Sequence, residues 1–161
     1  PPKRSREAHH HARSPARPPS VRRARPLRFF VIDVTCAIIQ RRDGKILAAQ
    51  RARSTHLPLK WEFPGGKVDE GEDPEMCIIR ELEEELGVTV RIVDRLKSNI
   101  HHYDEKSVRL IPFWCDIEQG RPRSLEHEQI KWVSVDLLET LDWCAADVPI
   151  VTVVIRRASG C

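Results

Sequence analysis

The chain has 161 residues and a formal net charge of +3, with 40% hydrophobic and 32% charged residues. This length predicts one domain with an adequate core, and no apolar run approaches the roughly 20 residues of a membrane span, which argues against a helical membrane protein. The five cysteines include no C-x-x-C pair. We therefore expect reduced thiols and a cytoplasmic protein rather than a disulfide framework or a zinc site.

The charge is unevenly distributed along the chain. Residues 1–28 are rich in proline and arginine and carry a net charge of +8, which leaves −5 for the remainder. With almost no large apolar side chains, this segment cannot bury enough surface to offset the entropy of ordering, so we predict a disordered tail over 1–28. Three interpretations of the tail stay open: an appendage without a part in catalysis, a basic arm that contacts nucleic acid, and a transit peptide. The folded domain is expected over 29–158.

The domain begins with two strand signals and a loop. The β-branched run 29–40 ends at Arg-Arg-Asp-Gly, a turn signal, and 45–51 is predicted to return as the second strand of a hairpin. A polar loop over 51–60 leads to the segment WEFPGGK, whose proline and paired glycines predict a sharp turn.

A helix follows this turn and has clear ends. Asp73 is a good N-cap, Pro74 suits the first helical position, and Gly87 can end the helix with a positive φ. At about 100° per residue, one apolar stripe forms along the helix, made of Ile78, Ile79, Leu82 and Leu86. The segment is therefore predicted to be a short amphipathic helix.

Three carboxylates share the neighbouring face of this helix. Glu81, Glu84 and Glu85 stand at positions i, i+3 and i+4, where like charges repel one another. One interpretation is a solvated acidic face. The other is a site for a hard divalent cation such as Mg²⁺ or Mn²⁺, which takes oxygen ligands.

Strands and a final helix complete the predicted order. Asp147 and Pro149 favour a helix start at the last segment despite its β-branched residues. The remaining segments are strands over 88–104 and 108–118, a loop over 120–129, a short strand over 130–135, a helical turn over 135–141 and a helix over 146–158. This order indicates an α/β sandwich.

The stretch from Gly66 to Val88, GKVDEGEDPEMCIIRELEEELGV, resembles a known family motif. It matches the Nudix box, G-x5-E-x7-R-E-U-x-E-E-x-G-U with U aliphatic, at every specified position. The chain therefore resembles a Nudix hydrolase. The resemblance implies an α/β/α sandwich with a mixed β-sheet, and hydrolysis of phosphoanhydride bonds with Mg²⁺ or Mn²⁺.

The resemblance also assigns roles within the box. Glu84 and Glu85 are expected to bind the metal, and Glu81 is expected either to bind it or to act as general base. The Gly66 carbonyl is expected to complete the metal shell. Glu72 is expected to support this shell, and Arg80 is expected to orient the box carboxylates by pairing with them.

A further ligand is expected outside the box. In MutT-like relatives a Glu-His pair lies several residues before a tryptophan, and the segment LEHEQIKW has this arrangement before Trp132. Glu126 is therefore expected to be an additional metal ligand or the general base, with Glu128 as the second choice. The alternative is an acidic loop without a role.

Other segments are similar to the MutT and CTP pyrophosphohydrolase branch of the family. By this resemblance Arg51 and His56 would contact the nucleotide, Phe63 would lie near the base, and Lys106 would meet phosphate or base. Asp147 stands where MutT has a base-reading asparagine. An ionised aspartate only accepts hydrogen bonds, so it suits the amino group of cytosine or adenine, whereas a protonated carboxyl group would suit guanine.

The expected activity is metal-dependent conversion of a nucleoside triphosphate to the monophosphate and pyrophosphate. The preferred substrates would be oxidised or modified nucleotides, such as 8-oxo-dGTP or modified CTP or dCTP, in a cytoplasmic monomer or homodimer that cleans the nucleotide pool for DNA repair. The alternatives are hydrolysis of another nucleoside diphosphate linked to a sugar or a second nucleotide, and a nucleotide sensor that does not cleave.

Overall fold

The computed structural model describes residues 30–160 of the chain. The predicted disordered tail and its contact with nucleic acid lie outside these residues. The domain boundaries at residues 29 and 158 stay predictions.

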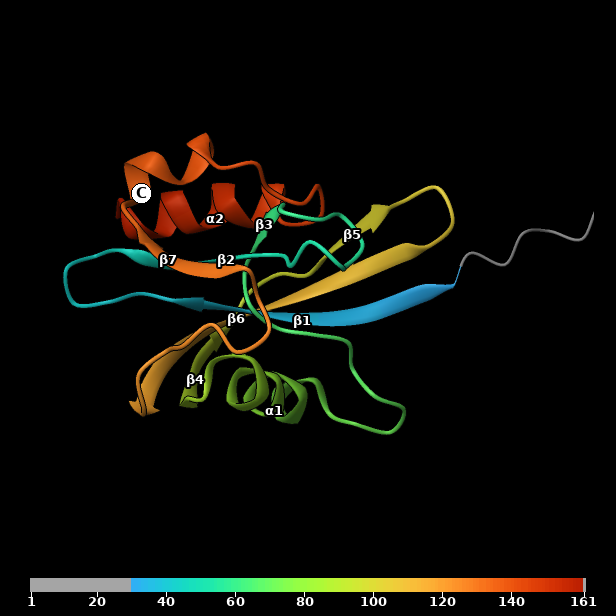
Figure 1. Ribbon diagram of the computed structural model, residues 1–161, viewed down its shortest axis with the longest axis horizontal. Coiled ribbons are helices and arrows are strands. Elements are labelled where there is room, and N and C mark those ends of the chain that lie inside the picture. The colour runs from blue at the N-terminus through green and yellow to red at the C-terminus, as the bar shows by residue number, and fades with distance from the viewer. Residues whose placement is uncertain (1–29, 161) are drawn as a thin grey trace, which may run out of the picture.

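Two β-sheets form the centre of the fold (Figure 1). In the larger sheet, β1 (Val31–Ile39) runs parallel to β6 (Ser107–Gln119), while β4 (Thr89–Arg95) and β5 (Asn99–His102) pair antiparallel with β6. The smaller sheet is antiparallel and has the order β3 (Trp61–Glu62), β2 (Ile46–Gln50), β7 (Gln129–Val133).

Helices cover the two sides of these sheets. Helix α1 (Pro74–Leu86) lies below the sheets in Figure 1, and helix α2 (Val148–Ala158) lies above them with the 3₁₀ segment η1 (Val135–Thr140). The larger sheet is mixed, because β1 is parallel to β6 while its other pairings are antiparallel. The predicted α/β/α sandwich with a mixed sheet is therefore confirmed.

The ends of α1 are formed as the sequence predicts. The Asp73 carboxylate accepts a hydrogen bond from the Glu75 amide at 2.8 Å, and Pro74 occupies the first turn. Gly87 adopts a left-handed conformation with φ of 69°, and its N–H donates to the Glu83 carbonyl at 3.0 Å. These local contacts determine which residues belong to the helix and therefore which carboxylates share a face.

Two buried clusters hold the layers together. One packs α1 against the sheets around Ile78, Leu82 and Phe113, and the other packs α2 against them around Trp143 and Val154. The apolar stripe of α1 is thus turned into the core, and the acidic residues beside it are left at the edge of the core.

Leu82→Ala is expected to destabilise the protein by about 2–5 kcal/mol, because the side chain is fully buried and its removal leaves a cavity. Denaturant unfolding of the variant measures this loss. Leu137→Ala removes the same atoms from a side chain that is 51% exposed and should change stability by less than about 0.5 kcal/mol. Equal losses in the two variants would contradict this placement of the core.

The structure corrects two predicted strand arrangements. Segments 29–40 and 45–51 do not form a continuous hairpin, because β1 and β2 belong to different sheets. The two segments are joined by a hydrogen-bonded turn and by an isolated bridge between Gln40 and Ile46. Segment 88–104 is divided into β4 and β5, since β6 is long enough to pair with both in succession. The two-residue strand β3 was not predicted, and it places Glu62 beside β2.

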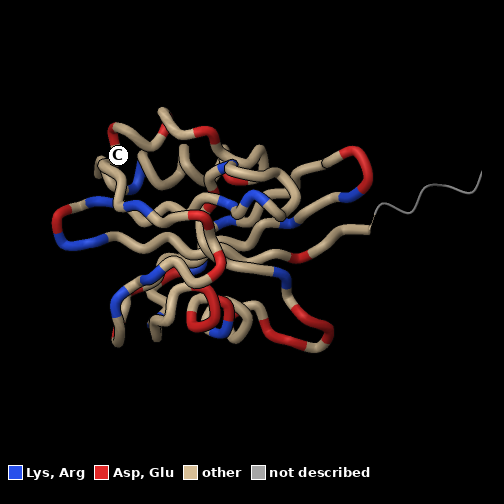
Figure 2. Tube along the Cα trace, viewed as in Figure 1, with Lys and Arg blue, Asp and Glu red and all other residues tan. Residues whose placement is uncertain are grey.

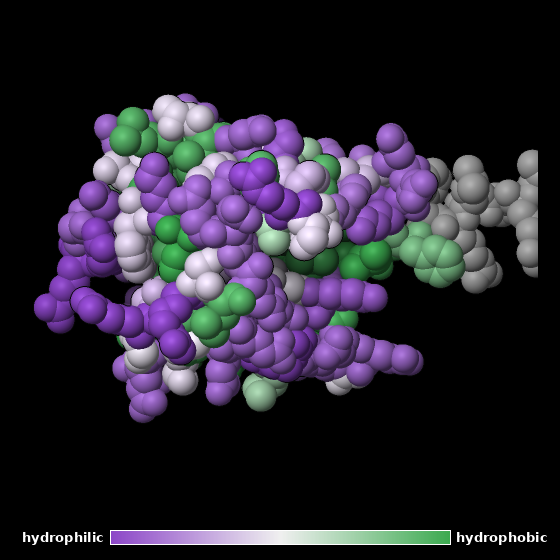
Figure 3. Space-filling model, in the orientation of Figure 1, coloured by the Kyte–Doolittle hydropathy of each residue, from purple (hydrophilic) through white to green (hydrophobic). Residues whose placement is uncertain are grey.

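Charge and hydropathy are unevenly distributed over the surface. Acidic residues gather on α1 and on the loop before it (Figure 2). The face shown in Figure 3 is mostly hydrophilic, and its apolar residues form separate patches. Within residues 30–160 no helix has the length and apolar character needed to cross a membrane.

Candidate active site

The acidic face of α1 contains one carboxylate that is almost fully buried. Glu85 is only 8% exposed, and its Oε2 accepts a hydrogen bond from the Gly65 amide at 3.2 Å. Burial, together with the nearby carboxylates of Glu62 and Glu81, raises the pKa of Glu85 to about 9. Burial also raises the pKa of Glu81. A buried group of this kind is stabilised by a cation that can approach it.

Arg80 connects the carboxylates of this region. Its Nε and Nη2 donate to the two oxygens of Glu72 at 2.8 and 2.9 Å, and its Nη1 donates to Glu81 at 3.0 Å and to Glu84 at 3.3 Å. The side-chain hydrogen bonds from Arg80 lower the pKa of Glu72 to about 2. Arg80 therefore pairs with the box carboxylates, in the arrangement that the sequence predicts for an orienting residue.

The glycine turn before α1 passes very close to its neighbours. A side chain at Gly65 would overlap the Thr35 carbonyl, and a side chain at Gly66 would overlap the Glu81 carboxyl group. The Gly66 carbonyl already accepts hydrogen bonds from the Thr35 amide at 2.8 Å and from the Thr35 hydroxyl at 3.1 Å. It is thus turned toward β1, and its predicted role as a metal ligand stays a prediction.

The loop before β7 brings Glu126 to the same region. Glu126 lines a small cavity together with Glu62, Glu85 and His127, and it lies within electrostatic reach of Glu81 and Glu85. Glu128, the second choice from the sequence, instead forms an exposed ion pair with Arg53 at 3.5 Å. The geometry therefore favours Glu126 over Glu128 as the additional acidic residue.

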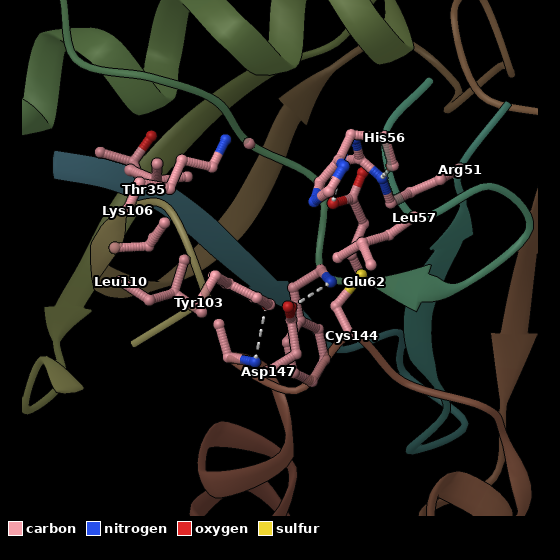
Figure 4. Close-up of a pocket in the computed structure, with 15 residues that line it drawn as sticks. Thr35, Arg51, His56, Leu57, Glu62, Tyr103, Lys106, Leu110, Cys144 and Asp147 are labelled. Atoms are coloured by element: carbon pink, nitrogen blue, oxygen red, sulfur yellow. Dashed lines mark hydrogen bonds and ion pairs between the residues drawn. The ribbon is translucent and has the colours of Figure 1, made fainter. Parts of the chain in front are cut away.

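A larger cavity of about 170 Å³ adjoins this acidic region. Its walls come from the loop after β2, from the turn between β5 and β6 and from the segment before α2, and Figure 4 shows Arg51 and His56 opposite Tyr103 and Lys106. All five predicted substrate residues line this cavity: Arg51, His56, Phe63, Lys106 and Asp147. Their positions in one cavity are compatible with the predicted contacts to a nucleotide.

Asp147 has a different hydrogen bond from the one that its sequence position predicts. It is the N-cap residue of α2, but its side chain makes no capping hydrogen bond. Instead, Oδ1 accepts from the Phe63 amide at 2.9 Å, across 84 positions of sequence. Burial raises the pKa of Asp147 well above its usual range.

Residues 30–152 match the NUDIX domain. The chain belongs to the Nudix family. As a Nudix hydrolase it acts on phosphoanhydride bonds.

Curated relatives of this Nudix hydrolase include two proteins of Escherichia coli K12. The chain is 32% identical to a CTP pyrophosphohydrolase over 120 residues, which is 74% of this chain and 88% of the relative. It is 28% identical to an 8-oxo-dGTP diphosphatase over 120 residues, or 74% of this chain and 93% of that protein.

Solved structures show the same fold. The MutT protein of Methanosarcina mazei Go1 matches with a TM-score of 0.72 and 27% identity, covering 81% of this chain and 97% of that one. The MutT protein of methicillin-resistant Staphylococcus aureus 252 matches with a TM-score of 0.67 and 40% identity, covering 80% and 98%.

The Nudix site contains residues that the sequence did not single out. Thr35, Leu57, Glu62, Tyr103 and Cys144 line the larger cavity. Only Glu62 had a signal that could have been used, because it is an acidic residue within WEFPGGK just before the Nudix box. The others come from segments that the fold brings together, so spacing along the chain does not reveal them.

Proposed function

We propose that this Nudix hydrolase is a divalent-metal-dependent nucleoside triphosphate pyrophosphohydrolase. It converts the triphosphate and water to the monophosphate and pyrophosphate. Its substrates are oxidised or modified nucleotides, such as 8-oxo-dGTP or modified CTP and dCTP. The named relatives act on nucleotides of these kinds, as their names state.

The observation that carries this proposal is that the larger cavity and the small acidic cavity adjoin and share lining residues. Arg51 and Glu62 line both the larger cavity and the small acidic cavity that contains Glu85 and Glu126. A nucleoside in the larger cavity would thus have its phosphates directed toward the acidic face of α1. The hydrophobic and polar lining of the larger cavity suits a base, and the carboxylates suit metal-bound phosphates.

The acidic residues fit a hard divalent cation. Residues 30–160 contain no ready-made cluster of three acidic, histidine or cysteine side chains with metal-site geometry. The donors are nonetheless all carboxylate oxygens, and one of them, Glu85, is buried beside Glu62 and Glu81. Glu81, Glu84, Glu85 and Glu126 would hold Mg²⁺ or Mn²⁺, which when bound neutralises phosphate charge and lowers the pKa of water.

The remaining residues position these groups, and one carboxylate takes part in proton transfer from the attacking water. Arg80 holds Glu81 and Glu84 through one nitrogen and is itself held by both oxygens of Glu72. Either Glu81 or Glu126 accepts the proton of the attacking water as general base. The amide of Gly65 holds Glu85 in its buried position.

Glu72→Gln is expected to raise the Mg²⁺ concentration for half-maximal turnover by about 10-fold, because Arg80 loses the carboxylate that binds two of its nitrogens. A magnesium titration of the initial rate measures this shift. Glu75→Gln removes an exposed carboxylate from the first turn of the same helix and should leave the titration unchanged. Indistinguishable titrations for Glu72→Gln and the wild type would refute this role for Glu72.

The substrate proposal is tested by a screen of normal, oxidised and methylated nucleoside triphosphates with Mg²⁺, in which pyrophosphate and phosphate release are measured separately. Release of pyrophosphate, with faster cleavage of a modified nucleotide than of the normal ones, supports the substrate proposal. Preferential cleavage of sugar nucleotides or dinucleotides would instead support hydrolysis of another nucleoside diphosphate derivative. Tight nucleotide binding without cleavage would indicate a sensor.

We also propose a cytoplasmic location, which rests on the pattern of cysteines. Cys36, Cys77, Cys115 and Cys144 are buried free thiols. A role in cleaning the nucleotide pool, and thereby in DNA repair, follows from the proposed substrates. The choice between monomer and homodimer stays a prediction, to be measured by light scattering.

A further inference from the structure

One carboxylate, Glu62, connects the two cavities of the site. Its Oε2 accepts a hydrogen bond from Arg51 Nη1 at 3.0 Å, and its Oε1 is 3.0 Å from His127 Nε2. Arg51 follows β2, Glu62 ends β3, and His127 lies in the loop before β7. The two oxygens of Glu62 therefore hold one residue from the wall of the larger cavity and one from the loop that carries Glu126.

His127 is held tightly for a residue in a surface loop. Its side chain is only 6% exposed, although both neighbours in the sequence, Glu126 and Glu128, are exposed. Because a carboxylate oxygen accepts, the Nε2 of His127 is the donor in the contact with Glu62. Its Nδ1 is buried and has no hydrogen-bond partner within residues 30–160. The contact with Glu62 is thus the one that orients the ring in the described part of the chain.

The main chain of the loop is attached to the active-site elements by other contacts. The amides of Arg123 and Leu125 donate to the carbonyls of Leu86 and Glu85 at the end of α1, at 3.0 and 3.1 Å. After His127, the amide of Glu128 donates to the Gln50 carbonyl of β2 at 2.9 Å. These bonds hold the loop on both sides of the Glu126–His127 pair.

Glu126 itself has no such anchor. None of the residues from 30 to 160 donates a hydrogen bond to its carboxylate, yet it lines the small cavity beside Glu85. Its placement therefore depends on its own backbone. Two side-chain contacts restrain that backbone at the next residue: the Ser124 hydroxyl donates to the His127 carbonyl at 2.7 Å, and the His127 ring is bonded to Glu62.

We propose that His127 is a positioning residue that, by its hydrogen bond to Glu62, holds the backbone of Glu126 so that this carboxylate faces the carboxylates of α1. His127 does not touch the nucleotide. The expected effect on turnover rests on the proposed function. The expected effect on metal binding does not depend on turnover. Glu62 acts as the shared anchor, with Arg51 on its other oxygen.

The proposal separates effects on turnover from effects on nucleotide binding. Removal of the His127 ring frees Glu126 but leaves the contact between Glu62 and Arg51 in place. His127→Ala is therefore expected to lower kcat by about 10–100-fold, the range for residues that support metal ligands. KM should change by less than about threefold, because the residues of the larger cavity keep their contacts.

Two conservative variants distinguish positioning from general damage to the loop. A glutamine at position 127 can place an amide nitrogen near the position of Nε2, so His127→Gln should recover most of kcat. An asparagine is too short to reach Glu62, so His127→Asn should behave like His127→Ala. His102→Ala is the matched control, because His102 is an exposed histidine bonded to Ser107 and lines neither cavity.

The decisive experiment measures kcat, KM and Mn²⁺ affinity for the full chain and these variants, with thermal melting as a check of folding. Mn²⁺ affinity is measured by electron paramagnetic resonance without nucleotide. We expect about 10-fold weaker Mn²⁺ binding in His127→Ala and His127→Asn, and near-normal binding in His127→Gln and His102→Ala. If His127→Ala does not fold, the comparison of His127→Asn with His127→Gln decides.

Wild-type Mn²⁺ affinity and kcat in folded His127→Ala or His127→Asn would overturn the proposal. Equal losses in His127→Gln and His127→Asn would also overturn it, since they would show that the ring is needed for packing alone. If the wild type cleaves no nucleoside triphosphate, the proposed function fails, and Mn²⁺ affinity still decides the role of His127.

Discussion

Glu85→Gln is expected to lower kcat by about 10²–10³-fold while the fold is kept. Glu85 is 8% exposed, accepts a hydrogen bond from the Gly65 amide and interacts electrostatically with the carboxylates of Glu62 and Glu81. Glutamine has the same shape but no charge, so it cannot supply the anionic oxygen that a hard cation requires. Steady-state kinetics with Mg²⁺ measure the loss, and circular dichroism verifies the fold.

The same helix offers a control for this prediction. Glu83 is an exposed residue on α1, and its side chain has no ion pair within residues 30–160. Glu83→Gln should therefore keep nearly full activity. If Glu85→Gln retained wild-type kcat, or if Glu83→Gln lost as much, the assignment of the metal-binding face would be wrong.

Asp147→Asn is expected to change the base preference by about 100-fold or more in the ratio of kcat/KM values. Oδ1 of Asp147 is occupied by the Phe63 amide, which leaves the other oxygen for a base in the cavity. The carboxyl group can accept a hydrogen bond from a base in its ionised form or donate one in its protonated form, which burial favours by raising the pKa. An asparagine that keeps the Phe63 contact presents only an amide donor. Activity should fall for cytosine, which presents an amino group, relative to guanine, which presents a carbonyl. An unchanged ratio for CTP and GTP would refute base reading by Asp147.

Asp147→Asn is also expected to alter the dependence of stability on pH. Burial raises the pKa of Asp147 in the folded protein, so the protonated form favours folding. The wild type is then most stable below the usual aspartate pKa and loses stability as the pH rises toward the raised folded value. Asparagine does not titrate, so the variant should be more stable than the wild type at pH 7.5.

Denaturant unfolding at pH 4 and pH 7.5 measures this difference. The advantage of the variant should shrink at pH 4, where the unfolded aspartate also becomes protonated. Asp142→Asn is the matched control, because Asp142 is 74% exposed and pairs with Lys60 at the surface. It should show little change at either pH. If Asp147→Asn were more stable than the wild type by the same amount at both pH values, this would contradict a raised pKa at Asp147.

Local chemistry explains why α1 could be predicted in detail. Asp73 and Gly87 determine the helix ends through contacts within a few residues of the chain. The helix period then places Glu81, Glu84 and Glu85 on one face, and Arg80 reaches two of them from the same helix. No distant part of the protein is needed for these relations, which is why spacing alone was sufficient.

The strand arrangement could be predicted only in part. Alternation and β-branched residues identified most strands, but they do not specify partners. The assignment of β1 and β2 to different sheets depends on β6 and β7, which lie more than 60 residues further along the chain.

By itself, the sequence determined the family, the bond type and the acidic face of α1, because these depend on residues within one short segment. The tertiary structure alone decided which distant groups meet this face. It turned the Gly66 carbonyl toward Thr35, gave Asp147 the Phe63 amide as its partner, and joined His127 to Glu62 across 65 positions. Such contacts follow from how the sheets and loops pack, and the spacing of residues along a chain does not contain that information.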